Sequence, residues 1–179
     1  MRTRNLKSEA GISMIEVMLA ASMMAVCSLS LMALIGSSIA SNTRNKFDST
    51  TTMLVQSVVE QISATVIGSG TSTLTDCNGT SWTIDSEPGG ATLTSSDKID
   101  FTQTSPPTNY RMLYVVRSPC TSTGIEQAVY DVRWNVQLIG SGVTATNTFL
   151  LSVGGQMQDR GQGNKYFASP VNVRVLLGN

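Results

Sequence analysis

The stretch ISMIEVMLAASMMAVCSLSLMALIGSSIASNT, residues 12–43, decides the architecture of this 179-residue chain. It contains one charged side chain, Glu16, and no proline. Its most apolar part, residues 17–40, would extend roughly 36 Å as an α-helix, which exceeds the roughly 30 Å of a bilayer's hydrocarbon layer. The sequence therefore predicts a single helix that crosses a membrane.

Basic residues precede this segment and set its predicted orientation. Arg2, Arg4 and Lys7 lie before it, opposed only by Glu9. Because positive flanks stay cytoplasmic, we expect the N-terminus inside the cell and the rest of the chain exported. The apolar run is too long for a cleaved secretory signal, and Cys27 lies in its middle, whereas a lipoprotein cysteine follows a short apolar region. A plain signal anchor is the main alternative, and it explains everything except the single carboxylate.

The carboxylate of Glu16 needs a partner, because an isolated charge in an apolar segment is costly. Insertion scales put the cost at about 2.5–3.5 kcal/mol at mid-membrane, and such residues are functional by default. No lysine, arginine or histidine lies in residues 12–43, so the partner must be a lipid headgroup, another chain or a new α-amino group. A cut after Gly11 would create an amine at Ile12, roughly 6 Å along the helix axis from Glu16. In a bundle, Glu16 of one chain could then neutralise the amine of its neighbour.

The residues around that point resemble the class III leader of type IV prepilins and type II secretion pseudopilins. The matching sequence is KSEAG followed by ISMIEV, residues 7–17. The resemblance implies that prepilin peptidase cuts between Gly11 and Ile12 and that Ile12 becomes N-methylated. It also implies that Glu16, the fifth mature residue, is the glutamate used in filament assembly.

The chain departs from the family pattern at three places. Ile12 stands where the family usually has Phe, and Met14 where it usually has Leu. Both residues are apolar, so cleavage is still expected, at a rate that they could lower. The family often has a proline in the membrane helix, which is absent here, and residues 36–38 (GSS) supply a softer break.

Beyond the membrane segment we expect an amphipathic helix over residues 42–66. An apolar stripe recurs there at spacings of seven and four residues, with polar residues on the other faces. The stripe comprises Phe47, Thr51, Leu54, Val58 and Ile62. The sequence GSG at residues 68–70 ends the helix. In a pilin-like fold the stripe would pack against a sheet.

The rest of the chain predicts β-strands. The strongest is residues 129–139, where Tyr130, Val132, Trp134, Val136 and Leu138 alternate with polar residues, so that one face is core and the other is wet. Further strands are expected around Tyr110–Val116, Phe149–Val153 and Val171–Leu177, paired antiparallel through short loops, with shorter candidates at Ser81–Ile84 and Lys98–Thr102.

The predicted fold class is therefore α+β and pilin-like, with a long N-terminal helix packed on a C-terminal antiparallel β-sheet. The expected segments are a cleaved leader (1–11), a transmembrane and assembly helix (12–40), its amphipathic continuation (41–67) and a β-rich extracytoplasmic head (68–179).

Two cysteines fall in the predicted head, where oxidation is permitted. A disulfide between Cys77 and Cys120 is expected, and it would tether the connection between helix and sheet to a loop between strands. The alternative is two free thiols. Cys27 is expected to pack in the membrane as a small hydrophobe.

Catalytic, metal and nucleic-acid functions have little support in the sequence. The chain has no histidine and no nucleophile-elbow or P-loop spacing, so we expect no enzyme activity, cofactor or metal site. Twelve basic and twelve acidic residues argue against nucleic-acid binding. The acidic pairs Asp97/Asp100 and Asp85/Glu87 are interpreted as solvated turns, and Asn78, in the sequence NGT, as a turn residue beside Cys77.

The resemblance points to a structural subunit whose partners are prepilin peptidase, other pilin subunits, the assembly platform and the inner membrane. The pattern from Tyr130 to Val136 is similar to that of V-type minor pilins, which favours a minor pilin of a type IV pilus. A type II secretion pseudopilin is the alternative, and a signal-anchored envelope enzyme or binding protein is a more remote one. The expected location is the inner membrane, with the N-terminus inside and the head in the periplasm, followed by the pilus at the cell surface.

Overall fold

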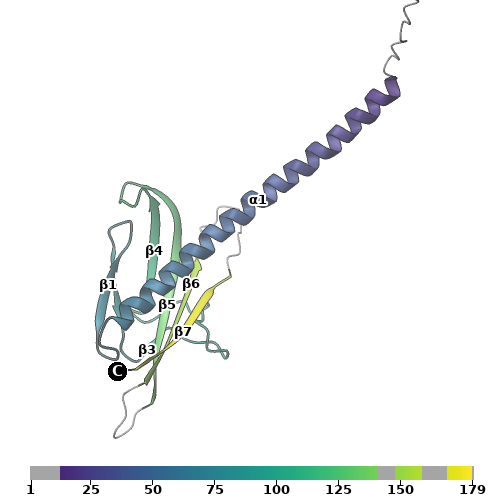
Figure 1. Ribbon diagram of the computed structural model, residues 1–179. Coiled ribbons are helices and arrows are strands. Elements are labelled where there is room, and N and C mark those ends of the chain that lie inside the picture. Colours follow the sequence, from purple (N-terminus) through teal and green to yellow (C-terminus); the bar gives the residue numbers. More distant parts are fainter. Residues whose placement is uncertain (1–12, 141–147, 159–168, 179) are drawn as a thin grey trace, which may run out of the picture. The chain divides into compact units, whose positions relative to one another are not determined.

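The computed structural model describes residues 13–140, 148–158 and 169–178, and the chain divides into two compact units after Thr43. One helix, α1 (Met14–Ser63), runs through both units and is followed by strands in the second (Figure 1). The strands are β1 (Thr71–Thr75), β2 (Ser81–Asp85), β3 (Gly89–Gly90), β4 (Arg111–Ser118), β5 (Ile125–Gly140), β6 (Thr148–Met157) and β7 (Val171–Gly178).

The strands confirm the predicted α+β class with an antiparallel sheet. The main sheet has the order β3-β5-β6-β7, and β4 pairs with the same edge of β5 as β3 does. All these pairings are antiparallel. The four main predicted strands are present, and the short candidate at Ser81–Ile84 is β2, which pairs with β1 in a separate hairpin. The strands β1 and β3 were not singled out from the sequence.

The C-terminal half of α1 packs on this sheet through the stripe expected from the sequence. Thr51, Leu54, Val58 and Ile62 are all buried, and Phe47 is partly buried. Val55, which is fully buried, widens the stripe. The backbone of β6 approaches closely at Gly155, where a Cβ atom would lie 2.9 Å from side-chain atoms of both Thr51 and Val55. A glycine is therefore part of the helix–sheet contact.

The helix ends at Ser63, three residues before the predicted end. Gly68 then adopts φ +91°, and a Cβ atom there would lie 2.8 Å from the ring of Phe149. The buried hydroxyl of Ser86 holds the following loop by donating to the Gly70 carbonyl oxygen at 2.7 Å. Residues 68–70, which were predicted to end the helix, thus form a turn and are also held against the core.

The face of the sheet toward α1 is the hydrophobic core. Trp134 is fully buried, and its indole Nε1 donates to the Asp85 carbonyl oxygen at 2.9 Å, so the ring loses no hydrogen bond on burial. Leu138, expected in the core, is 45% exposed. Leu138 is the last residue of β5 in register with the core-facing partners on β6, and a register shift follows between Leu138 and Gly140.

The opposite face of β5 was predicted to be wet, and that prediction is wrong at Asp131 and Arg133, whereas Gln137 is exposed. Asp131 and Arg133 are 2% and 3% exposed. Residues 91–103 pass over this face, and the Arg133 guanidinium donates to the carbonyl oxygens of Asp100 and Gln103 at 3.2 and 2.8 Å. Alternation along β5 shows which residues share a face, but it cannot show that a distant segment covers the polar face.

The covering segment also corrects a predicted strand. Residues Lys98–Thr102 form no strand, only an isolated bridge between Ile99 and Leu93. Ile99 instead packs on Gly154, where a Cβ atom would lie 2.8 Å from that of Ile99. Its backbone N–H donates to the Asn172 side-chain oxygen at 3.0 Å. The segment is therefore held to the sheet by side-chain and backbone contacts in place of a strand ladder.

Candidate assembly surface

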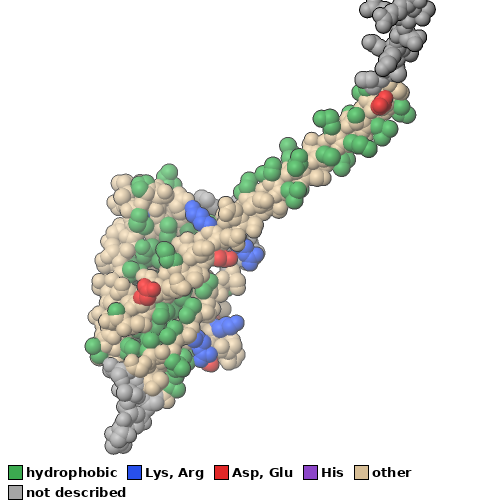
Figure 2. All heavy atoms as spheres, viewed as in Figure 1, with side chains coloured by type: hydrophobic (Ala, Val, Ile, Leu, Met, Phe, Trp, Pro, Cys, Tyr) green, Lys and Arg blue, Asp and Glu red, His purple; other side chains and the backbone are tan. Residues whose placement is uncertain are grey.

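The N-terminal half of α1 presents apolar side chains on all its faces. From Met14 to Ile39 every residue is exposed, and Figure 2 shows the hydrophobic side chains along this part of the helix. It is the one stretch among the described residues that is long and apolar enough to cross a membrane, and none of it is buried inside the structure. A core helix of a soluble domain would be mostly buried, so that explanation of its apolarity does not hold.

Five hydroxyl groups of residues 13–43 are satisfied within the helix. Ser22, Ser28, Ser30, Ser37 and Thr43 each donate to a backbone carbonyl oxygen three or four residues earlier, at 2.8–2.9 Å. Such bonds remove the need for water, because the donor finds its acceptor on the same helix. Five polar side chains are thereby compatible with an apolar surrounding.

Glu16 lies in the first turn of α1, where the helix begins. The Glu16 and Val17 N–H groups donate to the Ser13 carbonyl oxygen at 2.9 and 3.2 Å, which closes that turn. The Glu16 side chain is exposed, and none of residues 13–43 carries a positive charge. Gly11 and Ile12, the expected cleavage and methylation site, lie outside the described residues, as does the rest of the expected leader.

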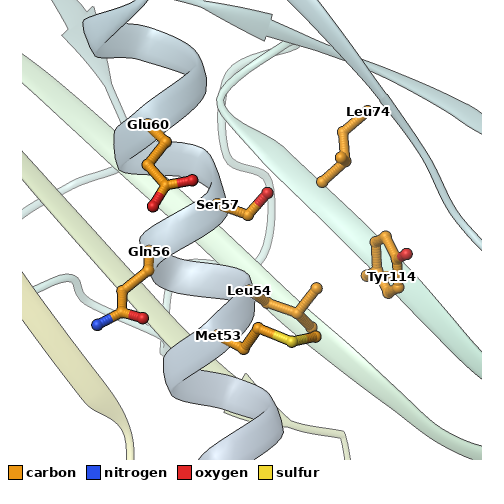
Figure 3. Close-up of a pocket in the computed structure, with 7 residues that line it drawn as sticks. All are labelled: Met53, Leu54, Gln56, Ser57, Glu60, Leu74 and Tyr114. Atoms are coloured by element: carbon orange, nitrogen blue, oxygen red, sulfur yellow. The ribbon is translucent and has the colours of Figure 1, made fainter.

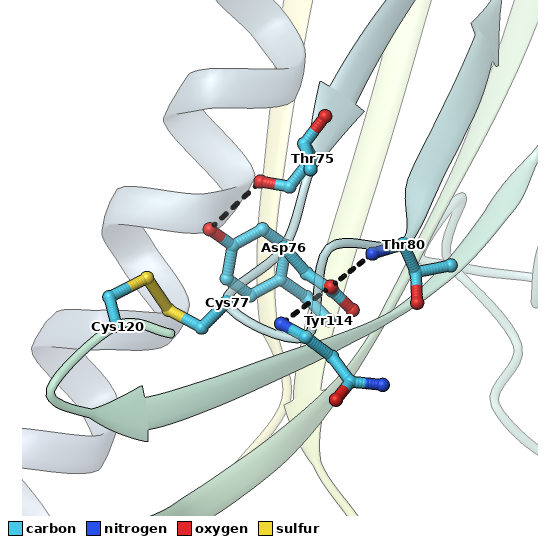
Figure 4. Close-up of a disulfide and its surroundings, with 7 residues drawn as sticks. Thr75, Asp76, Cys77, Thr80, Tyr114 and Cys120 are labelled. Atoms are coloured by element: carbon cyan, nitrogen blue, oxygen red, sulfur yellow. Dashed lines mark hydrogen bonds between the residues drawn. A yellow bond between two sulfur atoms is a disulfide. The ribbon is translucent and has the colours of Figure 1, made fainter. Parts of the chain in front are cut away.

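The head carries the expected disulfide between Cys77 and Cys120, whose Cα atoms are 4.7 Å apart (Figure 4). It joins the turn after β1 to the loop between β4 and β5, as anticipated. The turn is further closed by Asp76, whose Oδ1 accepts hydrogen bonds from the N–H groups of Asn78 and Thr80 at 2.9 Å. Asn78 is an exposed turn residue, which agrees with the sequence interpretation.

A group of charged side chains on the far face of the sheet was missed by sequence analysis. Both oxygens of Asp131 accept from Arg111 at 3.0 Å, and both also accept from Arg133, at 2.8–3.2 Å. Phe101 stacks on the Arg133 guanidinium, with its centroid 5.2 Å away. The contacts lie within the head, so the group holds residues 91–103 on the sheet.

A groove beside α1 was also missed. It has a volume of about 290 Å³ and lies between the helix and strands β1 and β4 (Figure 3). Met53, Leu54, Leu74 and Tyr114 supply its apolar surface, and Gln56, Ser57 and Glu60 its polar one. Burial, and to a smaller degree the charge of Asp76, raises the pKa of Tyr114, so its hydroxyl is neutral at ordinary pH. No sequence signal indicates this groove, because its walls come from three elements.

Comparisons with protein families, curated proteins and solved structures found no match. The functional conclusion therefore depends on the residues and geometry of this chain. Two observations stand out among the described residues: an exposed apolar helix that contains one carboxylate, and a head closed by a disulfide. The first is compatible with a segment that crosses a membrane, and the second is compatible with an oxidising surrounding.

The acidic pairs act in turns, as the sequence suggested. Asp85 accepts from the Glu87 N–H at 3.0 Å, and Asp97 pairs with Arg174 at 3.3 Å. The hydrogen bonds that Asp100 accepts from the Thr102 hydroxyl and N–H lower the pKa of its carboxyl. Among the described residues, no group of three or more potential metal ligands is assembled.

Proposed function

We propose that this chain is a structural subunit of a type IV pilus, a V-type minor pilin, held in the cytoplasmic membrane before assembly. The observation that carries the proposal is the lone carboxylate of Glu16 in the first turn of an exposed apolar helix, five residues after Gly11. The similarity of residues 7–17 to class III leaders supports cleavage between Gly11 and Ile12 and methylation of the new amine. The disulfide between Cys77 and Cys120 supports placement of the head in the periplasm.

The apolar half of α1 explains why such a subunit would pass directly from membrane to filament. Burial of a large apolar side chain away from water is favourable by about 1.5–3 kcal/mol. A helix segment with so many exposed apolar side chains is therefore strongly disfavoured in water. In lipid, its backbone is satisfied by the helix, and the hydroxyls of Ser28 and Ser30 are satisfied by carbonyl oxygens of the same helix. Packing against the same segment of other subunits provides an equivalent apolar surrounding outside the membrane.

The charge on Glu16 would make that transfer selective. Cleavage after Gly11 produces a positive amine at Ile12. When the helices of two neighbouring subunits are staggered, the Glu16 carboxylate of one subunit can lie beside the Ile12 amine of the other. Leaving either charge unpaired in an apolar bundle is strongly unfavourable, by about 3–5 kcal/mol for a broken buried pair. Only subunits that are processed and correctly offset would then join the bundle.

The mass of the protein from its native membrane tests this proposal. We expect a species that lacks residues 1–11 and carries one added methyl group. Gly11→Val should retain the full leader, whereas Gly36→Val, within α1 and with open space around it, should be processed normally. Recovery of the wild-type chain only in a form that begins at Met1 would overturn the proposal.

A further inference from the structure

Strand β7 forms an open edge of the main sheet. Among the described residues no strand pairs with its outer side, because the sheet order ends at β7. The strand is eight residues long, pairs with β6 without a register shift, and contains no proline and one charge, Arg174. Natural sheets usually protect such edges with prolines, bulges, lysines or short strands.

This edge is apolar toward α1 and mixed on its other face, where Asn172, Arg174 and Leu176 lie. Val173 and Val175 are only half-buried on the side toward α1, and Leu176 on the other side is 65% exposed. An open edge with exposed apolar side chains and a single charge is suited to pairing with another protein surface. The residues 171–178 are called the β7 edge below.

The groove between α1, β1 and β4 lies toward the opposite edge of the sheet from β7. Tyr114 belongs to β4, which pairs with the far edge of β5, while β7 is separated from β5 by β6. The groove has features that match an edge strand. Met53, 61% exposed, and Leu74 can cover apolar side chains, while the Gln56 amide and Ser57 hydroxyl can bond to unpaired backbone groups.

The charges at the two surfaces are opposite. Glu60 lies at the groove and is exposed, and no cation pairs with it among the described residues. Arg174, the only charge of the β7 edge, pairs with Asp97, but both side chains are about half exposed, 43% and 57%. Such a pair contributes little, so Arg174 is free to interact with a second carboxylate.

We propose that the β7 edge of one copy of this chain docks in the groove of Met53, Leu74, Tyr114 and Glu60 on the next copy. Because the two surfaces are different and lie at opposite sides of one domain, the contact is heterologous and can repeat without closing. This inference builds on the proposed pilus function and adds a contact between heads to the contact between helices.

The membrane orientation favours this arrangement over a twofold one. An antiparallel β7–β7 pair would be related by a twofold axis perpendicular to the sheet, and that axis would reverse the direction of one copy's α1. Chains that enter from the same membrane need their helices parallel. A contact from β7 edge to groove has no such twofold axis and therefore allows the helices to stay parallel.

Disulfide trapping between two differently tagged full-length chains tests the contact. Both carry Cys27→Ser, one has Met53→Cys in the groove, and the other has Val175→Cys or Leu176→Cys on the β7 edge. We expect oxidation to give the mixed dimer with at least one of the two edge positions, and no homodimer of either chain. Ile125→Cys, 75% exposed and outside the groove lining, replaces the edge cysteine in the matched control and should give none.

The charge pair supplies a second measurement. Glu60→Lys or Arg174→Glu alone should lower the trapped dimer by up to about fivefold, and combining Glu60→Lys on one chain with Arg174→Glu on the other should restore it. Filaments sheared from the same cells separate this inference from the proposed function. Filaments without mixed dimers would overturn the contact alone, mixed dimers without filaments would overturn only the pilus proposal, and homodimers would establish a twofold contact in its place.

Discussion

Asp131 forms an ion pair with Arg133, which lies on the same face of β5, and the Arg133 Nη2 is 2.8 Å from the Asp131 Oδ2. Arg111 on β4 pairs with the same carboxylate at 3.0 Å and stands directly opposite Arg133 in the strand register. Like charges directly opposite in a sheet repel. The Asp131 carboxylate thus converts a repulsive cross-strand pair into an attachment for residues 91–103.

The Asp131→Asn variant should lose much of the head's stability. Two guanidinium groups, 28% and 4% exposed at the side chain, would remain without their carboxylate. We expect the free energy of unfolding to fall by about 3–5 kcal/mol. Denaturant titration of the detergent-solubilised chain, followed by tryptophan fluorescence, measures it. Arg174→Ala, which breaks an exposed pair, should cost less than about 1 kcal/mol, and an equal loss in both variants would contradict this role.

Removal of the disulfide should also destabilise the head. Cys77 and Cys120 are 43 residues apart in the sequence. Closing a loop of that size lowers the entropy of the unfolded chain, and the contribution is about 3–4 kcal/mol. The Cys77→Ser/Cys120→Ser variant should show this loss in the same titration, while Cys27→Ser leaves the unfolding midpoint unchanged. Identical gel mobility with and without reductant would argue against the disulfide itself.

Gly155→Ala should weaken the packing of α1 on the sheet and lower the stability of the head. The added methyl group would lie 2.9 Å from side-chain atoms of Thr51 and Val55, both in the buried stripe of α1. Overpacking of this kind costs about 1–3 kcal/mol. Gly178→Ala, in a position with nothing within 4 Å, is the matched control and should have little effect on thermal unfolding. A stable Gly155→Ala variant would show that the helix can shift without loss.

The head should lose stability in alkaline solution. Burial raises the pKa of Tyr130 above its ordinary value of 10.0, a hydrogen bond with Thr50 opposes the shift, and the charge of Asp48 adds to it. The unfolded chain therefore releases this proton at lower pH than the folded one, so the stability is fully present below about pH 10 and is lost as pH rises through the folded value. Tyr130→Phe should flatten the fall in unfolding midpoint between about pH 9 and 11. An unchanged slope would assign the loss to other groups.

Glu16→Ala should leave membrane insertion and leader removal intact while preventing incorporation into filaments. The proposed pair with the amine of a neighbouring subunit would be absent, leaving that amine unpaired in an apolar bundle. Immunoblots of membrane and sheared filament fractions compare the two steps. Glu87→Ala, which removes an exposed carboxylate of the head, should be incorporated like the wild type. Normal incorporation of Glu16→Ala would contradict the assembly role.

The main elements of the fold followed from local patterns. The stripe from Thr51 to Ile62 recurs at helical spacing, and its members are the residues that α1 buries. The four long strands alternate or run apolar, and all are present. These predictions succeed because helix and strand periods are properties of consecutive residues. Strand β1, made largely of threonine and serine, has no apolar alternation from which it could be found.

The sequence by itself determined that one long helix begins with an apolar half, that Glu16 is the only charge in this apolar half, and that an antiparallel sheet follows. Only the tertiary structure decided that residues 91–103 bury Asp131 and Arg133, that three elements form the groove at Met53 and Tyr114, and that β7 ends the sheet. The physical reason is that burial and edges arise from contacts between distant segments, whereas periodicity records only what neighbouring residues share.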